Sequence, residues 1–356
     1  TFSDNERDQA NNAIETAKSV ETLEKTETGW SMILDWQNDK VARMIETGNG
    51  GSKQVSSFGL GLDKMSTACL IQGLMDRKGE IKPDWTGSQN PQDPEFVKRE
   101  PGLSLELDNE RLLSQIQVLL LSFGIKAKLA RQQSGPCHPF RPTLRITGQG
   151  VSIYAKDIGS RLETHITKLK ELVTEIEPIT EITDRVARIT AEGEEPVFDL
   201  TEPETSHFVA NGIVVHNCSE YLHINGTSCL SGETEITTPD GLETIKELLE
   251  KQKNGKQVYV ATEIQSETNH NRMRAFRPAL VLEQGEKPVF RIETKDGRSI
   301  RATADHRFLT ETGWKRVDEM VAGKTKIQIA TLQNSPPKRP SEGEDAKIWR
   351  LLGWIA

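Results

Sequence analysis

The sequence predicts a multi-domain α+β protein, and three observations lead to this prediction. The chain has 356 residues, which is too many for one small core and favours two or three domains. Residues 64–177 mix helical and strand periodicity. Residues 178–329 instead contain mostly short strand patterns separated by Gly or Pro turns. We therefore expect a mixed α/β region followed by a β-rich region.

Composition and charge exclude several classes of protein. Hydrophobic residues make up 35% and charged residues 28%, which is typical of soluble globular chains. No apolar run approaches the roughly 20 residues of a bilayer span, so no membrane partner is expected. A formal net charge of -8 argues against a nucleic-acid-binding surface over the whole molecule. The four cysteines form no CxxC pair, and no secretory leader follows Thr1, so we predict a cytoplasmic protein.

The first region is predicted to contain helices and strands in alternation. An apolar helical pattern runs over 64–75, and Gly79 is expected to end that helix. Asn109 is a suitable N-cap for a helix that Gly124 ends. The other expected elements are a strand at 103–107, a strand and short helix within 141–158, and an amphipathic helix at 161–177.

The second region is predicted to be built from short strands. They cover residues 185–189, 197–200, 207–209, 213–215, 289–294 and 299–302. Asp296-Gly297 between the last two strands is a strong hairpin signal. The Pro-rich stretch 334–340 has the composition of a linker.

His216-Asn217-Cys218 follows an apolar strand and combines three useful chemical groups. The carboxamide nitrogen of Asn217 can attack its own main-chain carbonyl, form a succinimide and break the next peptide bond. His216 can donate a proton in that reaction, and Cys218 supplies a thiolate that accepts an acyl group. The tripeptide alone is also compatible with an ordinary strand end.

Four segments resemble the sequence blocks of inteins. Residues 212–218 resemble an intein C-terminal splice junction, and 197–201 resemble the block before it. Residues 229–236 resemble an intein N-terminal block that begins at its nucleophile, and 303–306 match a TxxH block. The resemblance implies β-rich Hint (intein splicing) segments.

The resemblance also implies the first chemical step. Cys229 would accept the Ser228 carbonyl in an N-to-S acyl shift. His306 would protonate or strain that amide, with Thr303 hydrogen-bonded nearby.

The later steps would involve the preceding junction. For the intein that ends at Asn217, Cys218 would be the downstream thiol that takes that intein's acyl group by transesterification, and Asn217 with His216 would then release the product. Asp199 matches the acidic residue that coordinates these steps in the family. The family commonly places a histidine one residue before His207. Because a shift of one residue in a strand turns the side chain to the opposite face, we expect His207 to be a solvated or hydrogen-bonded strand histidine rather than a catalytic one.

The order of the blocks is unusual, because an intein end precedes an intein beginning. The simplest account is two inteins in one host precursor, the first lacking its start and the second its end. The predicted segments are a partial LAGLIDADG homing-endonuclease-like region (1–182), a C-terminal Hint segment (183–217), a host segment (218–228), an N-terminal Hint segment (229–330), and a linker with the start of a second endonuclease region (331–356). We therefore expect a fragment, whose partners are the missing intein halves and flanking host segments. Splicing would be a single-turnover reaction without a cofactor.

Residues 71–79 resemble a degenerate LAGLIDADG motif, and 113–131 resemble a later repeat of the same endonucleases. The second acid of that motif would bind a divalent metal, expected to be Mg²⁺ in an active enzyme. Lys78 takes its place, so DNA cleavage is expected to be lost. The final residues 351–356 resemble a second, truncated motif.

Basic residues between Lys126 and Arg145 suggest a DNA-backbone face or an ordinary solvated loop. Cys137 and His138 lie in the same stretch, but two ligands without partners predict no metal site.

The host segment resembles the catalytic loop of the large subunit of ribonucleotide reductase, an oxidoreductase that supplies DNA replication. The likeness is greatest to the adenosylcobalamin-dependent class. In that family Cys218 would carry the thiyl radical and Glu220 would act as acid and base, with adenosylcobalamin as the cofactor of the complete enzyme.

Four alternatives stay open: an active homing endonuclease, a pure reductase, a module that binds DNA without cutting it, and a circularly permuted splicing unit. In the last of these, 183–217 would complete the β fold of 229–330. Cys218 would attack the Ser228 thioester, and a cyclic peptide of 11 residues would be released.

Overall fold

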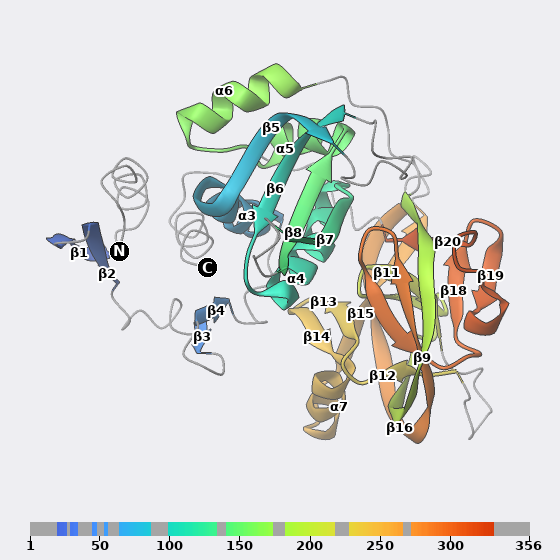
Figure 1. Cartoon of the computed structure of the whole chain (residues 1–356). Helices are drawn as coiled ribbons and strands as arrows, with labels where there is room; N and C mark the ends of the chain where they lie inside the picture. The colour runs from blue at the N-terminus through green and yellow to red at the C-terminus, as the bar shows by residue number, and fades with distance from the viewer. Residues whose placement is uncertain are drawn as a thin grey trace. The chain divides into compact units, whose positions relative to one another are not determined.

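The chain forms two compact units, each described here separately (Figure 1). A computed structural model describes residues 20–26, 29–34, 45–47, 53–55, 64–86, 99–133, 140–173, 182–217, 228–265 and 272–330. The first unit comprises Thr1–Ile116, Arg131–Glu177 and Pro336–Ala356, and the second comprises Gln117–Ala130 and Pro178–Ser335. Helices and strands occur together in a strand-rich arrangement of several sheets, so the predicted α+β class is confirmed. Within the described residues, no helix has the length and apolar character needed to cross a bilayer.

A four-stranded sheet in the order β5-β6-β8-β7 lies mostly in the first unit, and residues Ala127–Ala130 of β7 belong to the second unit. Its strands are β5 (Gly79–Thr86), β6 (Arg99–Glu106), β7 (Ala127–Gln133) and β8 (Phe140–Thr147). The helices of this region are α3 (Lys64–Lys78), α4 (Glu110–Leu120), the 3₁₀ turn η3 (Leu121–Phe123), α5 (Gln149–Asp157) and α6 (Glu163–Leu172). Two further two-stranded sheets pair β1 (Val20–Thr26) with β2 (Gly29–Leu34), and β3 (Ile45–Thr47) with β4 (Lys53–Val55).

The local signals for helix ends in this region are confirmed. Helix α3 ends at Lys78, directly before Gly79. The Asn109 side chain accepts a hydrogen bond from the Leu112 amide at 3.1 Å, which caps α4. Gly124 ends the following 3₁₀ turn with a φ of 75°, a left-handed conformation that glycine adopts without a Cβ clash.

Helix α6 is shorter than the predicted 161–177 helix. It begins at Glu163 and ends at Leu172, and Val173 has extended backbone angles. The Arg161 amide is held instead by the Asp76 carboxylate at 3.2 Å, and β-branched Val173 favours an extended backbone. Residues 174–177 of the predicted helix lie outside the described residues.

The second unit is built on a 12-stranded sheet in the order β14-β13-β10-β11-β18-β20-β9-β12-β17-β16-β15, with β19 paired to β18. Its elements are β9 (Ile182–Thr201), β10 (His207–Ala210), β11 (Ile213–His216), β12 (Leu230–Ser231), β13 (Glu235–Thr238), β14 (Gly241–Thr244), α7 (Ile245–Lys253), β15 (Val258–Gln265), β16 (Arg272–Thr294), β17 (Ser299–Ala302), β18 (Arg307–Thr310), β19 (Gly313–Arg316), the 3₁₀ turn η4 (Val317–Glu319) and β20 (Lys326–Ile329). One buried hydrophobic core includes side chains from both 182–217 and 228–330.

The two predicted strands at 185–189 and 197–200 are wrong as separate elements. The structure contains one 20-residue strand, β9, which pairs antiparallel with the 23-residue β16 (Figure 1). Gly193 and Pro196 resemble strand breakers in the sequence, but the register shifts near them absorb the irregularity. Long-range pairing therefore overrides the local break signals. The predicted Asp296-Gly297 hairpin between β16 and β17 is confirmed.

The turn between β10 and β11 fixes the position of the chain just before Asn217. Asn211 and Gly212 have φ values of 50° and 75°, as a two-residue hairpin turn with two left-handed residues requires. The Asn211 side chain donates to the Ser299 carbonyl at 2.7 Å and accepts from the Glu235 amide at 2.8 Å. The turn thus joins the segment before residue 218 to strands that follow residue 228.

A Gly212→Ala substitution should test this turn. A Cβ there would lie 2.6 Å from an Arg298 guanidinium nitrogen, and φ is already left-handed. We expect a loss of about 2 kcal/mol in unfolding free energy. Gly285→Ala is the matched control, because Gly285 has a similar φ of 74° and open space around it. Urea unfolding read by hydrogen exchange of β10 and β11 should show a larger loss for Gly212→Ala; equal losses would contradict the steric argument.

Candidate active site

The peptide bond before Cys229 is held by the turn that follows β17. Strand β12 pairs Leu230 with Ala302, and this register brings Thr303 beside Cys229. The Cys229 amide donates to Thr303 Oγ1 at 2.8 Å, and the Thr303 amide donates to the Cys229 carbonyl at 3.0 Å. Thr303 therefore holds both the amide nitrogen and the carbonyl oxygen of Cys229. These two hydrogen bonds fix the orientation of the Ser228–Cys229 peptide bond.

His306 contacts the residue that precedes this bond. Its amide donates to the Thr303 carbonyl at 3.1 Å, which closes the turn, and its Nδ1 lies 3.1 Å from Ser228 Oγ. The ring is fully buried, and burial lowers the pKa of His306 to about 3, with His216 adding to the effect and Asp305 opposing it. At neutral pH the ring is therefore uncharged.

The thiol of Cys229 is also fully buried. Burial raises the pKa of Cys229 to about 11, Lys287 acts to lower it, and the charges of Asp199 and Asp305 act to raise it. Lys287 Nζ donates to Cys229 Sγ at 3.4 Å. The thiol is thus protonated at rest, with one cation in direct contact.

Asp199 reaches this site from β9. Strand β9 pairs with β12 through Phe198 and Leu230, which places the neighbouring Asp199 near Cys229. The Asp199 carboxylate is buried and accepts a hydrogen bond from Thr201 Oγ1 at 3.2 Å. An acid from the segment before residue 218 therefore faces the thiol of the segment that starts at residue 229.

Asn217 directly follows β11 and is buried. Its side-chain nitrogen donates to the Glu202 carbonyl at 2.5 Å, and its side-chain oxygen accepts from the Glu202 amide at 3.0 Å. His216 Nδ1 lies 3.0 Å from the Asn217 carbonyl oxygen, the group that succinimide formation would attack. The His216 ring packs edge-on against Trp314, with ring centroids 4.8 Å apart. The reacting amide is thus clamped, and its carbonyl already has a histidine partner.

Glu202 holds this clamp and was not predicted from the sequence. Its side chain is fully buried, and its carboxylate accepts from the amides of Glu204 at 2.8 Å and Thr205 at 2.7 Å and from Thr205 Oγ1 at 2.5 Å. These bonds close the loop between β9 and β10 on itself. The only available signal was an acid directly after an apolar strand end, which is a weak one.

His207 is held in a strand by hydrogen bonds. Its ring nitrogens lie 2.8 Å from the Thr205 carbonyl and 2.9 Å from the Glu263 carbonyl. It pairs directly opposite His216, so both side chains share one face of the hairpin. The expected reversal of face assumed a strand through Ser206, whereas β10 begins at His207 and Ser206 has a φ of 57°.

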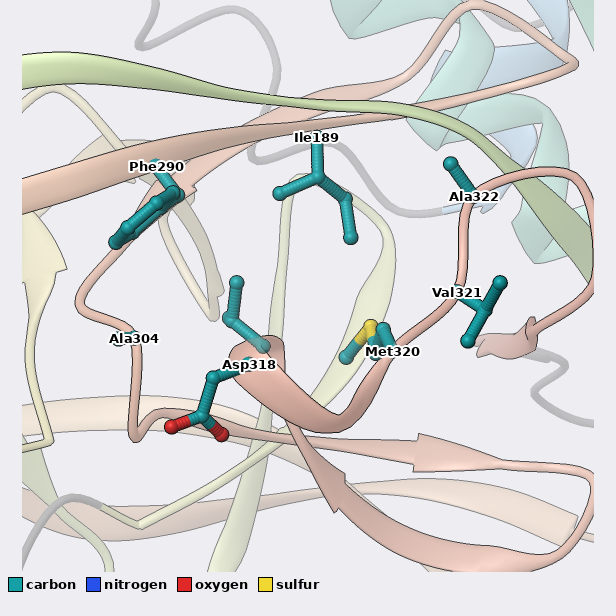
Figure 2. Close-up of a pocket in the computed structure, with 8 residues that line it drawn as sticks. Ile189, Phe290, Ala304, Asp318, Met320, Val321 and Ala322 are labelled. Carbon is teal, nitrogen blue, oxygen red and sulfur yellow. The ribbon is translucent and has the colours of Figure 1, made fainter.

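An apolar pocket of about 390 Å³ lies next to Ala304, a residue of the Thr303–His306 turn (Figure 2). It is lined by Ile189, Phe290, Ala304, Val317, Asp318, Met320, Val321 and Ala322. The amides of Val317 and Asp318 donate to the carbonyls of His306 and Ala304, each at 3.0 Å. The 3₁₀ turn η4 is therefore hydrogen-bonded to the Thr303–His306 turn.

The residues at the end of α3 do not fit the Mg²⁺ site of an active endonuclease. Asp76 is buried and accepts hydrogen bonds from Ser160 Oγ at 2.5 Å and from the Arg161 amide. Lys78 is exposed and brings a positive charge where the motif has an acid. Among the described residues, no group of three or more His, Cys, Asp or Glu side chains could hold a metal ion.

Two members of the predicted basic stretch contact acids within the chain. Lys126 Nζ lies 2.6 Å from an Asp184 oxygen, and Arg141 lies 3.2 Å from Glu106. These contacts favour a structural role for both cations. Other predicted features, namely Cys137, His138, Cys218, Glu220 and the segments 334–340 and 351–356, lie outside the described residues.

Comparison with protein-family models gives no match. A segment of 128 residues is 37% identical to replicative DNA helicase DnaB of Rhodothermus marinus, covering 36% of this chain and 13% of the helicase. Replicative DNA helicase DnaB of Synechocystis sp. is 39% identical over 69 residues, covering 19% of the chain and 8% of the helicase. The same helicase of Nostoc sp. is 35% identical over 96 residues, covering 26% and 10%. The chain thus spans about a tenth of the length of these curated relatives, all of which carry the name replicative DNA helicase.

The low pKa of His306 gives a testable pH dependence. In the unfolded chain this histidine binds a proton near pH 6.5, whereas in the folded chain it does so only near pH 3. The free energy of unfolding should therefore decrease as the pH falls from about 6.5 to about 3, by about 1.4 kcal/mol per pH unit. Urea unfolding of Cys229→Ala chains with and without His306→Gln should show a shallower pH slope in the double variant. Equal slopes would show that the ring is not buried in its neutral form.

Proposed function

We propose that the second unit catalyses acyl transfer at its own peptide bonds, as intein splicing segments do. Two contacts at the Ser228–Cys229 bond carry the proposal: the Cys229 amide donates to Thr303 Oγ1, and the Ser228 hydroxyl lies next to His306 Nδ1. Asn217 lies in the same unit, and His216 contacts its carbonyl. Two junctions with the appropriate nucleophiles thus belong to one folded body.

The first step would convert the amide before Cys229 into a thioester. Cys229 Sγ attacks the Ser228 carbonyl carbon, the bond from that carbon to the Cys229 nitrogen breaks, and the thiol proton passes to this nitrogen. Thr303 Oγ1 holds the nitrogen during the step. The neutral His306 ring beside Ser228 can relay the proton.

The remaining steps would take place at the preceding junction. In the two-intein account, the Cys218 thiol attacks the thioester formed at the start of the first intein and releases that intein's own nucleophilic thiol. The Asn217 side-chain nitrogen then attacks the Asn217 carbonyl carbon, which forms a succinimide and frees the Cys218 amine. His216 is placed to donate a hydrogen bond to the carbonyl oxygen as negative charge develops on it. An S-to-N acyl shift onto the freed amine completes an amide bond.

The short matches are compatible with a small module carried within a longer protein. The similarity to DnaB helicases covers only 8 to 13% of their length, so it supports no helicase activity for this chain. In the two-intein account, a reductase host would supply residues 218–228, and adenosylcobalamin would serve the complete host enzyme. That host, the missing intein halves, DNA as a partner and a cytoplasmic location are proposals that rest on the sequence.

The circularly permuted unit is a second candidate, and the strand pairing favours it. Strand β11 pairs Ile213 with Ile329 and Val215 with Phe308. Strand β10 pairs Ala210 with Ile236. The segment before residue 218 therefore completes the sheet of the segment after residue 228. In this arrangement the reaction closes residues 218–228 into a ring.

Intact-mass spectrometry of the purified chain separates the two accounts. The permuted unit should give residues 1–217 ending in a succinimide, residues 229–356, and a cyclic peptide lighter by one water than linear 218–228. Their masses should sum to that of the chain, since no water is consumed. Cys229→Ala should abolish the cyclic product. A chain that forms a dithiothreitol-cleavable thioester at Cys229 but no cyclic peptide would retain the acyl shift and reject the permuted unit.

Substitutions should separate the two junctions. Asn217→Ala should leave thiol-induced cleavage before Cys229 intact and block cleavage after residue 217, because only the second reaction needs the carboxamide. Thr303→Val should slow cleavage before Cys229 by about 10²-fold, the usual effect of losing one stabilising hydrogen bond at a reacting group, and Thr303→Ser should retain it. Timed gel and mass measurements give both rates. Equal rates in Thr303→Val and the parent would show that Thr303 has no part in the step.

A further inference from the structure

Lys287 contacts the nucleophile from a strand that no sequence motif marks. It lies on β16, partly buried, and pairs opposite Glu195 of β9. Its Nζ donates to Cys229 Sγ at 3.4 Å. Because side chains alternate along a strand, Lys287 and Val289 share one face, and Val289 packs with Val197 and Cys229. The same short stretch of β16 thus supplies the apolar wall and the cation next to the thiol.

A β-bulge aims Lys287 at this position. The register between β16 and β9 shifts between Glu283 and Glu286, and Gly285 in this interval has a left-handed φ of 74°. Such bulges turn the following side chains of a strand relative to its partner. This irregularity lies just before Lys287, the residue that contacts Cys229. It can therefore set the direction in which the Lys287 side chain leaves the strand.

The charged groups around the Cys229 thiol show how the contact with Lys287 affects its ionisation. Asp199 on β9 and Asp305 in the catalytic turn both disfavour a thiolate, as does burial. Lys287 on β16 opposes them through its charge and its hydrogen bond. His306 is neutral and lies at Ser228, so it adds no positive charge. The groups that act on the thiol thus include one cation, and it touches the sulfur atom.

We propose that Lys287 is a catalytic residue of the acyl shift, whose ammonium group stabilises the negative charge on Cys229 Sγ as it attacks the Ser228 carbonyl. The inference rests on the proposed function. Lys287 keeps its own protons during the step, because the thiol proton moves to the Cys229 nitrogen as the carbon–nitrogen bond breaks. The residue acts before the thioester exists and has no part in Asn217 cyclisation.

The test measures dithiothreitol-induced cleavage before Cys229 in an Asn217→Ala chain. Lys287→Gln and Lys287→Met should slow it about tenfold at pH 7, the effect of one unit in the pKa of the thiol. Lys287→Arg should keep most of the rate, since it retains the positive charge. Lys253→Gln is the matched control, because Lys253 is an exposed lysine of the same unit that pairs with Glu250. Circular dichroism should show that each variant is folded.

A second measurement separates charge from packing. In a chain whose other cysteines, Cys69, Cys137 and Cys218, are replaced by Ala, the ultraviolet absorbance of the Cys229 thiolate is titrated against pH. The midpoint should rise in Lys287→Gln and stay near the parent value in Lys287→Arg. If the parent chain cleaves and Lys287→Gln changes neither the cleavage rate nor the titration midpoint, the proposed role of Lys287 is overturned while the acyl-transfer proposal stands. A parent chain that never cleaves overturns the acyl-transfer proposal, and the role of Lys287 with it.

Discussion

The two-residue strand β12 is the interaction on which the rest of the site depends. Leu230 pairs with Phe198 on one side and with Ala302 on the other. One pairing brings the acid of β9 toward the thiol, and the other brings the Thr303 turn to the scissile amide. Because both partners come from distant parts of the chain, neither half of the unit contains the complete site. The buried backbone hydrogen bonds of β12 therefore link folding of the sheet to assembly of the chemistry.

Burial has two opposite consequences for the chemistry of the site, because it acts on both His306 and Cys229. It keeps His306 neutral, which suits a proton relay, but it also keeps the Cys229 thiol protonated, which opposes nucleophilic attack. A cation on β16 and the fixed amide geometry offset the second effect. The site thus combines a buried environment, which would shield the proposed thioester from water, with local charge at the sulfur atom.

The hydrogen bonds to Glu202 hold the Asn217 side chain in one position. Its carboxamide is hydrogen-bonded at both ends to the backbone of Glu202, and the Glu202 carboxylate closes the loop that holds it. The nitrogen must leave this partner before it can attack the carbonyl beside His216. In the proposed reaction, release of the clamp would be a conformational step, distinct from thioester formation at Cys229.

The sequence by itself determined the α+β class, the helix ends at Gly79 and Gly124 and the Asp296-Gly297 hairpin, because turn and cap chemistry acts between near neighbours. It also supplied the candidate groups of both junctions, since these occur in short local motifs. Only the tertiary structure decided the rest. The 20-residue β9 forms because pairing with β16 outweighs the local break signals. Lys287 lies 58 residues from the thiol it contacts and Glu202 lies 15 residues from Asn217, so no local pattern could join them.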